Sequence, residues 1–259
     1  MKLKILVFLL ALLQPLTSYL SSSSMSSILM DRLQIPIVSP ATYAFSIWSI
    51  IILSSLFYGI HQLMSRKNSE LFSHLAPYAA LVFASFSLWL LAAEYNLLPG
   101  TVVIFLFMGY GLYKLFPKVV SAARSNKFSL WEKNIVYGTW GLYCGWATVA
   151  IFPNLAALIK FSGISDRGDV GLLWQTGVLV VATATVLYLQ KKFQWSSPYF
   201  AAVLWAYVAI VVGTLERGTV TGYLPYVAML ATTIIIFSFI KNRFIIQKLK
   251  KLLKANSLT

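Results

Sequence analysis

The sequence is dominated by apolar runs that approach 20 residues, the length that a helix needs to cross a lipid bilayer. The chain is 59% hydrophobic and 11% charged, whereas soluble domains usually carry about 25% charged residues. A membrane β-barrel would instead show alternating segments of about ten residues. We therefore predict an all-α, polytopic membrane bundle with about eight transmembrane helices, over residues 1–20, 41–64, 76–93, 97–116, 136–160, 170–190, 199–215 and 223–240.

Residues 1–20 allow two interpretations. The segment begins with two lysines and continues as a short apolar run, which resembles a secretory signal peptide. No clear cleavage site follows, and Gln14 and Pro15 interrupt the run. The segment is therefore either an uncleaved first helix or a signal whose removal would leave seven spans in the same orientation. The stretch that follows, residues 21–40, is polar at first and then rich in proline, and we expect a loop there.

The charges predict how the chain is oriented in the membrane. With eight spans and the N-terminus inside, the inside segments hold 17 of the 21 lysines and arginines. Because cytoplasmic loops are enriched in these residues, we predict an integral plasma-membrane protein with both termini cytoplasmic. The net charge of +14 is then explained by topology and by contacts with anionic membrane lipids, and not by nucleic-acid binding. The basic, amphipathic tail over 241–259 is expected to lie along the membrane surface.

The sequence offers little that could carry enzymatic or metal chemistry. Cys144 is the single cysteine, which excludes an intrachain disulfide and zinc-finger spacing, and His61 and His74 are too far apart for a metal motif. The ionisable residues lie at span ends, and the hydrolase, metalloprotease and phosphate-loop motifs are absent. The paired acids in the segment 166–169 are more typical of a solvated loop than of a cation site. We therefore expect neither an enzyme nor a metal site.

The fifth span carries more polar and aromatic residues than a membrane anchor needs. Tyr143, Trp146, Ala150 and Asn154 are spaced three, four and four residues apart, which places them on one face of a helix over about three turns. Lipid does not favour such a face. We therefore expect it to point at other helices or at a ligand.

The same span carries three glycines one helical turn apart, at positions 138, 141 and 145. Small residues at this spacing let two membrane helices approach each other closely. The partner helix could belong to this chain or to a second copy. A homodimer is therefore one of the two arrangements that the glycines allow.

The start of the second span is also rich in aromatic residues: Tyr43, Phe45 and Trp48. Such rings commonly form a belt at the depth of the lipid headgroups. Alternatively, they line an apolar pocket for a planar ligand, because such pockets favour aromatic walls with a few polar groups. The end of the third span would then contribute Trp89, Tyr95 and Asn96.

Together, these two stretches resemble the TspO/MBR family, the tryptophan-rich sensory proteins that include the mitochondrial translocator protein. The fifth helix of that family reads Y-x-x-W-x-x-x-A-x-x-x-N, which residues 143–154 match without a gap. The motif at the start of the second helix matches less closely, because a tyrosine replaces a tryptophan and the spacing is one residue shorter. The resemblance covers residues 1–160 as a five-helix core. It implies a divergent member with three additional spans over 161–240.

The resemblance implies a pocket between the helices, capped by the first loop, that binds tetrapyrroles such as haem and protoporphyrin, sterols and synthetic aromatic drugs. Carried over to this sequence, the ligand-binding residues would be Tyr43, Phe45, Trp48, Tyr143, Trp146 and Asn154. The rings would stack on a planar ligand. Asn154 would make one orienting hydrogen bond to it, or would pair with a neighbouring helix instead. The sterol motif of the animal members does not follow Asn154, so a sterol role is not supported.

The leading prediction is a membrane receptor or sensor that binds a hydrophobic, planar, tetrapyrrole-like ligand and needs no resident cofactor. A transporter of a small hydrophobic molecule is the alternative, although no inverted repeat is visible between the halves of the chain. An enzyme that modifies a porphyrin or a lipid is a third hypothesis. The missing acid–base pair argues against it.

Overall fold

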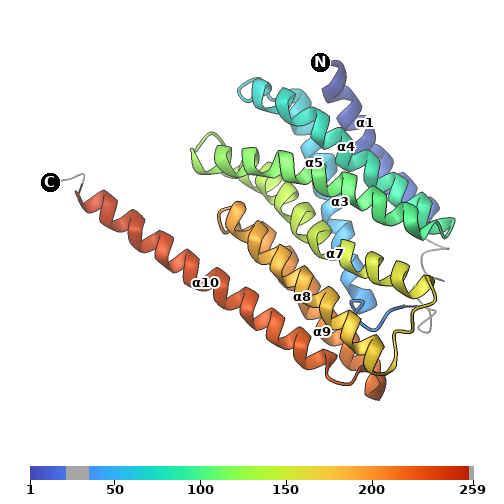
Figure 1. Ribbon diagram of the computed structural model, residues 1–259. Helices are drawn as coiled ribbons and strands as arrows, with labels where there is room; N and C mark the ends of the chain where they lie inside the picture. The colour runs from blue at the N-terminus through green and yellow to red at the C-terminus, as the bar shows by residue number, and fades with distance from the viewer. Residues whose placement is uncertain (22–34, 257–259) are drawn as a thin grey trace.

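The computed structural model describes residues 1–21 and 35–256, which contain helices and loops but no strand. Eight helical segments of this part of the chain are long and apolar enough to cross a membrane. The predicted all-α bundle and its number of spans are thereby confirmed (Figure 1). The protein is an integral, multi-pass membrane protein. The polar loop predicted to follow the first span lies, from residue 22 to residue 34, outside the described residues.

The long helices are α1 (Lys2–Leu20), α3 (Ile47–Met64), α4 (Ser69–Glu94), α5 (Leu98–Arg124), α7 (Thr139–Phe161), α8 (Gly168–Lys192), α9 (Ser197–Glu216) and α10 (Leu224–Asn256). Short helical turns precede three of them, namely η1 (Thr42–Ser46), α6 (Leu130–Glu132) with the π-helical η2 (Lys133–Gly138), and η3 (Gly218–Thr221). Several helices are longer than the apolar runs from which they were predicted. Amphipathic turns continue these helices beyond the apolar residues. The tail is an example, since its residues 241–256 continue α10 without a break.

Helix α7 lies at the centre of the bundle and contacts α3, α5, α8 and α9 (Figure 1). On the N-terminal side, α4 packs between α1 and α5, and α1 also packs on α3. On the other side, α10 packs on both α8 and α9. The three helices beyond residue 161 are therefore joined to the first five mainly through α7.

Helix α1 is built into the bundle by specific polar contacts. The Lys4 Nζ donates a hydrogen bond of 2.9 Å to Ser69 Oγ, and the Lys4 carbonyl accepts one of 3.1 Å from Gln62 Nε2. Further along, Thr17 Oγ1 donates to Ser87 Oγ at 3.3 Å. These contacts join α1 to α3 and α4.

Two of the three glycines of the fifth span, Gly141 and Gly145, allow α7 to lie close against α9. A Cβ atom at Gly145 would overlap the Tyr199 carbonyl oxygen, and one at Gly141 would lie 2.7 Å from Cβ of Pro198. The close contact that the glycines predict is therefore made within the chain, and α9 occupies that face of α7. Gly138 takes no part in it.

A buried carboxylate holds the turn before α7. Glu132 is 7% exposed and accepts hydrogen bonds from Asn68 Nδ2 at 2.8 Å and from the Ser129 backbone N–H at 2.9 Å. His61 Nε2 lies 3.3 Å from the same carboxylate. Ser129 and Glu132 cap each other at the start of α6. The cluster links α3, the N-cap of α4 and the segment that leads into α7.

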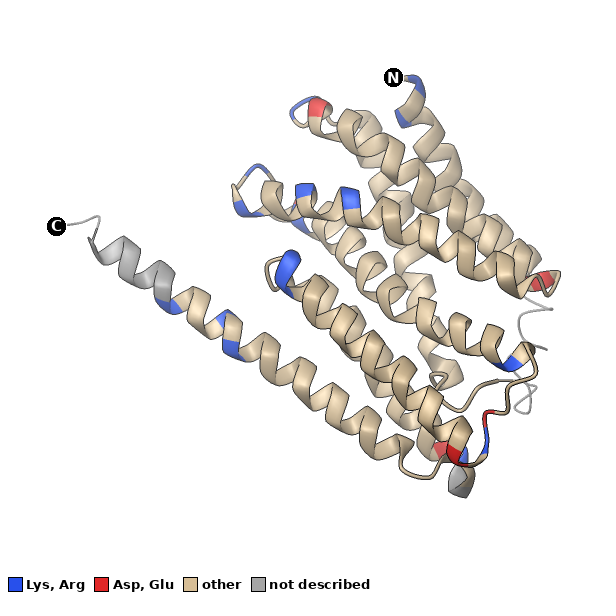
Figure 2. Cartoon of the chain, in the orientation of Figure 1, with Lys and Arg blue, Asp and Glu red and all other residues tan. Residues whose placement is uncertain are grey.

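Charged residues gather at the two ends of the bundle. Figure 2 shows lysines and arginines concentrated at the end that holds the N-terminus and the turns 65–68, 125–129 and 193–196. We call this the basic end. The turns 95–97 and 162–167 lie at the other end, here called the distal end, where most of the acidic residues are found (Figure 2).

Candidate functional site

A cavity of about 390 Å³ opens at the distal end between α4, α5 and α7, beneath the segment 35–42. It continues inward into a chamber of about 30 Å³, which we call the inner chamber. The two spaces share five lining residues, Pro40, Phe45, Trp89, Pro153 and Asn154. They therefore form one site with a wide mouth and a narrow aromatic end.

Aromatic rings form the walls of the inner chamber. The Trp48 ring centroid lies 6.0 Å from that of Trp89 and 6.2 Å from that of Trp146. Phe45 meets Trp146 edge to face at 5.9 Å, and Phe105 meets Trp89 in the same way at 5.3 Å. Edge-to-face pairs of this kind stabilise a fixed arrangement of rings. The chamber is thus a rigid, apolar slot.

Asn154 joins α7 to α4. Its side-chain oxygen accepts a hydrogen bond of 3.2 Å from Trp89 Nε1, and its Nδ2 donates one of 2.8 Å to the Ala150 carbonyl oxygen. The interhelical pairing weighed for this residue is therefore present. The amide oxygen keeps room for a second donor.

Two indole nitrogens of the inner chamber lack a hydrogen-bond acceptor. Trp48 and Trp146 are 8% and 2% exposed, and neither Nε1 has a partner among the described residues. An unpaired buried N–H costs free energy because its desolvation is not compensated. Both side chains line the chamber. Trp140 Nε1, which does not line the chamber, lacks an acceptor in the described part of the chain as well.

The six predicted site residues fall into three groups. Phe45, Trp48, Trp146 and Asn154 line the inner chamber together. Tyr143 lies behind it, where its ring meets Trp48 at 5.5 Å and its hydroxyl donates to Gln14 Oε1 at 3.4 Å. Tyr43 lies outside, half exposed, with its ring 5.4 Å from that of Trp205 on α9.

Other residues that line the cavity carry weaker sequence signals or none. Of the three residues expected from the end of the third span, Trp89 and Asn96 line the cavity, whereas Tyr95 does not. Phe105, Thr101 and Ala206 also contribute. These three lie in ordinary apolar spans, and no local pattern distinguishes them from residues that face lipid.

The segment that covers the cavity is held by α8 and α9. Arg217 donates hydrogen bonds from one guanidinium nitrogen to the carbonyl oxygens of Ile37 and Ser39, at 2.9 and 2.7 Å. Gln175 Oε1 accepts from the Val38 backbone N–H at 2.9 Å. The Ala41 N–H donates to the Ala209 carbonyl oxygen at 2.8 Å. The roof of the cavity is therefore positioned by helices outside the N-terminal five.

An ion pair lies at the mouth of the cavity. Lys160 lines the mouth, and its Nζ lies 2.8 Å from Asp166 Oδ2. Asp166 is 6% exposed, so the interpretation of the segment 166–169 as a solvated loop is wrong for this residue. Its carboxylate is buried against a lysine that the sequence places only six positions away. No group of three metal-ligating side chains occurs in the described part of the chain.

The side chains that line the cavity are not of the types that ligate haem iron. Haem iron is held by histidine, cysteine, methionine or tyrosine side chains. Among the residues that the structure describes, none of these types lines the cavity or the inner chamber. The amine of Lys160 is engaged by Asp166. The described walls are aromatic and apolar, and they offer no conventional axial ligand to a metal.

Comparison with known proteins assigns the family. Curated proteins and solved structures give no match to the chain. A family model described as "TSPO-like protein" matches residues 3–241. The match begins in α1 and reaches α10, so it includes the helices that form the aromatic chamber and those that hold its roof. The chain therefore belongs to the TSPO-like protein family.

Proposed function

We propose that this TSPO-like protein is a membrane receptor that binds an apolar, planar ligand of the tetrapyrrole class in the cavity. The observation that supports this most strongly is the pair of buried indole N–H groups, on Trp48 and Trp146, without an acceptor. Leaving a buried donor unpaired costs about 1–3 kcal/mol. A ligand whose edge presents a nitrogen or oxygen acceptor would recover that free energy, and the aromatic walls would stack on its faces.

The dimensions of the site suit one small molecule. A cavity of about 390 Å³ lies near the lower end of the roughly 300–1,000 Å³ typical of ligand pockets. The inner chamber is too small for a ring system, so only an edge of the ligand would enter it. The body of the ligand would lie in the wider part, beneath the segment 35–42.

We expect haem to bind no more tightly than the metal-free macrocycle. The lining residues that the structure describes include no conventional axial ligand for iron, so the iron would gain no binding free energy from them. Metal-free protoporphyrin and haem should therefore bind with similar affinity. The absorption bands of added haem should not show ligation by a protein side chain.

Removing the two indole N–H groups while keeping aromatic rings should weaken binding. In the double variant Trp48→Phe, Trp146→Phe, each lost hydrogen bond is expected to cost about 0.5–1.5 kcal/mol. Together the two losses should raise the Kd for metal-free protoporphyrin about tenfold. The Kd is measured from porphyrin fluorescence with the purified protein in detergent micelles.

Trp131→Phe is the matched control, because this tryptophan is 63% exposed and does not line the cavity. It should bind like the unaltered protein. Equal affinities for the double variant and the control would contradict the assignment of the inner chamber as the ligand site.

The charge distribution supports the proposal that the basic end faces the cytoplasm of a plasma-membrane protein. Because Cys144 is buried, new cysteines can be labelled selectively in intact cells. Ser162→Cys at the distal end should react with a membrane-impermeant maleimide. Lys67→Cys at the basic end should react only after the cells are opened. Labelling of Lys67→Cys in intact cells would reverse the proposed orientation.

A further inference from the structure

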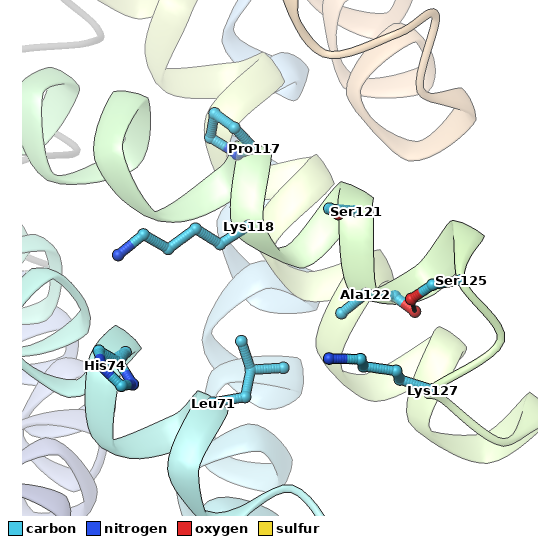
Figure 3. Close-up of a pocket in the computed structure, with 8 residues that line it drawn as sticks. All are labelled: Leu71, His74, Pro117, Lys118, Ser121, Ala122, Ser125 and Lys127. Atoms are coloured by element: carbon cyan, nitrogen blue, oxygen red, sulfur yellow. Dashed lines mark hydrogen bonds between the residues drawn. The ribbon is translucent and has the colours of Figure 1, made fainter.

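A second concave surface lies at the basic end, far from the ligand cavity in the fold. It is a groove of about 490 Å³ between the first turns of α4 and the last turns of α5. Figure 3 shows the side chains that line it, with Lys118 and Lys127 both extending from α5 and its following turn toward the α4 side. We call this the basic groove.

The basic groove has an apolar floor and a polar rim. Leu71, Pro117 and Ala122 supply the apolar surface. The hydroxyl groups of Ser121 and Ser125 lie along one edge (Figure 3). The α5 residues recur with helical spacing, so they form one continuous face of that helix. This mixture suits a molecule that is part hydrocarbon and part hydrogen-bond acceptor.

The rim is positively charged. Two lysines, Lys118 and Lys127, line the groove, and no carboxylate is among the described residues that line it. The ion pairs found among the described residues involve neither lysine. The Lys118 ammonium lies 5.4 Å from the centre of the Tyr78 ring on α4, which orients it across the groove. The local charge therefore favours an anion.

His74 adds a polar group whose orientation is defined. Its Nδ1 lies 3.0 Å from the Glu70 carbonyl oxygen, so Nδ1 carries the proton of that hydrogen bond. The other ring nitrogen, Nε2, takes no part in this hydrogen bond. Glu70 itself does not line the groove.

The groove lies at the depth of lipid headgroups. Its α4 residues, Leu71 and His74, precede the apolar run that begins at residue 76, and its α5 residues follow the run that ends at residue 116. The hydrocarbon core of the bilayer is therefore adjacent on one side of the groove, and water on the other. A lipid can reach it with its acyl chains still in the membrane.

We propose that the basic groove binds the phosphate-bearing headgroup of an anionic glycerophospholipid from the leaflet at the basic end. Basic pockets between transmembrane helices commonly hold anionic headgroups. Lys118 and Lys127 neutralise the phosphate, and Leu71 and Pro117 contact the glycerol and the first methylenes. The Ser121 hydroxyl donates to a phosphate oxygen, whereas the Ser125 hydroxyl donates to the Ala122 carbonyl oxygen at 3.2 Å. A choline headgroup is disfavoured, because its own cation would face the two lysines.

The test is lipid retention measured by native mass spectrometry. The purified protein is exchanged into micelles that contain either phosphatidylglycerol or phosphatidylcholine. We expect one phosphatidylglycerol per chain to be retained selectively. Removing both groove charges in Lys118→Gln, Lys127→Gln should weaken its retention about 30-fold, as expected for two lysines that each attract an anionic lipid.

Two further variants separate the groove from general effects. Arg66→Gln, Lys67→Gln removes two charges from a turn at the same end and should retain the lipid normally. Lys118→Arg, Lys127→Arg keeps the charge and should also retain it. Equal loss in the turn variant, equal retention of phosphatidylcholine, or unchanged retention in Lys118→Gln, Lys127→Gln would overturn the proposal.

Inorganic phosphate distinguishes a lipid from a free anion. If the acyl chains contribute to binding, an excess of phosphate should leave the phosphatidylglycerol adduct in place. Displacement of the lipid by phosphate would identify the groove as a site for a soluble phosphate and overturn the lipid assignment.

Discussion

Replacing Gly145 with leucine is expected to prevent stable assembly of the helix bundle. A Cβ atom at this position would overlap the Tyr199 carbonyl oxygen and lie 2.9 Å from Ala202 Cβ. Both neighbours belong to α9, and one of them is backbone, so neither can move aside without separating the two helices. Overpacking a well-packed interior costs about 1–3 kcal/mol or more, and a leucine at this backbone contact should exceed that range. Thermal unfolding of the detergent-solubilised protein measures the loss.

The control for this substitution is Gly177→Leu on α8. Apart from the chain neighbours of Gly177 and the backbone of its own helix, no described atom lies within 4 Å of the position that a Cβ would take. The new side chain should therefore extend outward and leave the unfolding temperature nearly unchanged. Equal unfolding temperatures for Gly145→Leu and Gly177→Leu would show that α7 and α9 are not in close contact.

Replacing Glu132 with alanine should also destabilise the protein strongly. The substitution removes the acceptor for Asn68 Nδ2 and for the Ser129 N–H, and it removes the carboxylate beside His61. Because Asn68 is 7% exposed, its amide would be left buried without this partner. Leaving a buried donor without its acceptor typically costs about 1–3 kcal/mol. The free energy of unfolding is measured by thermal or denaturant unfolding.

Glu70→Ala serves as the matched control, because this glutamate is exposed in the first turn of α4. It should change stability by no more than a few tenths of a kcal/mol, apart from a small loss at the helix N-terminus. Glu132→Gln, which keeps one acceptor oxygen, should fall between the two. If Glu132→Ala unfolded like Glu70→Ala, the buried cluster would contribute nothing to stability.

The architecture could be predicted from the sequence because the bilayer imposes a length on each apolar run. Eight runs become eight spans since backbone groups in lipid must be satisfied within a helix. Helix ends were harder to predict. Helix α5, for instance, continues through Pro117 to Arg124, where amphipathic turns follow the uncharged run. A hydropathy pattern indicates which residues lie in lipid. It does not indicate where the backbone hydrogen bonds of a helix end.

The aromatic residues of the site could be predicted in part. Helical spacing correctly placed Trp146 and Asn154 on one face of α7, and Trp48 lies opposite them. The same spacing cannot show depth, so Tyr143 was grouped with them although it packs one layer behind, against Gln14 of α1. Contacts with α9 could not be predicted, because nothing near Gly145 in the sequence indicates its neighbour Tyr199.

The hydrogen bonds that hold the roof of the cavity join parts of the chain that are synthesised far apart. Arg217 follows Ile37, whose carbonyl oxygen it binds, by 180 residues. Chains are generally made and folded from the N-terminus onward. A nascent protein that ends after α7 therefore has the aromatic walls but no anchor for the segment above them. The roof gains its anchors only when α9 and Arg217 have been made, so tight ligand binding would report the insertion of α9 and not that of α10.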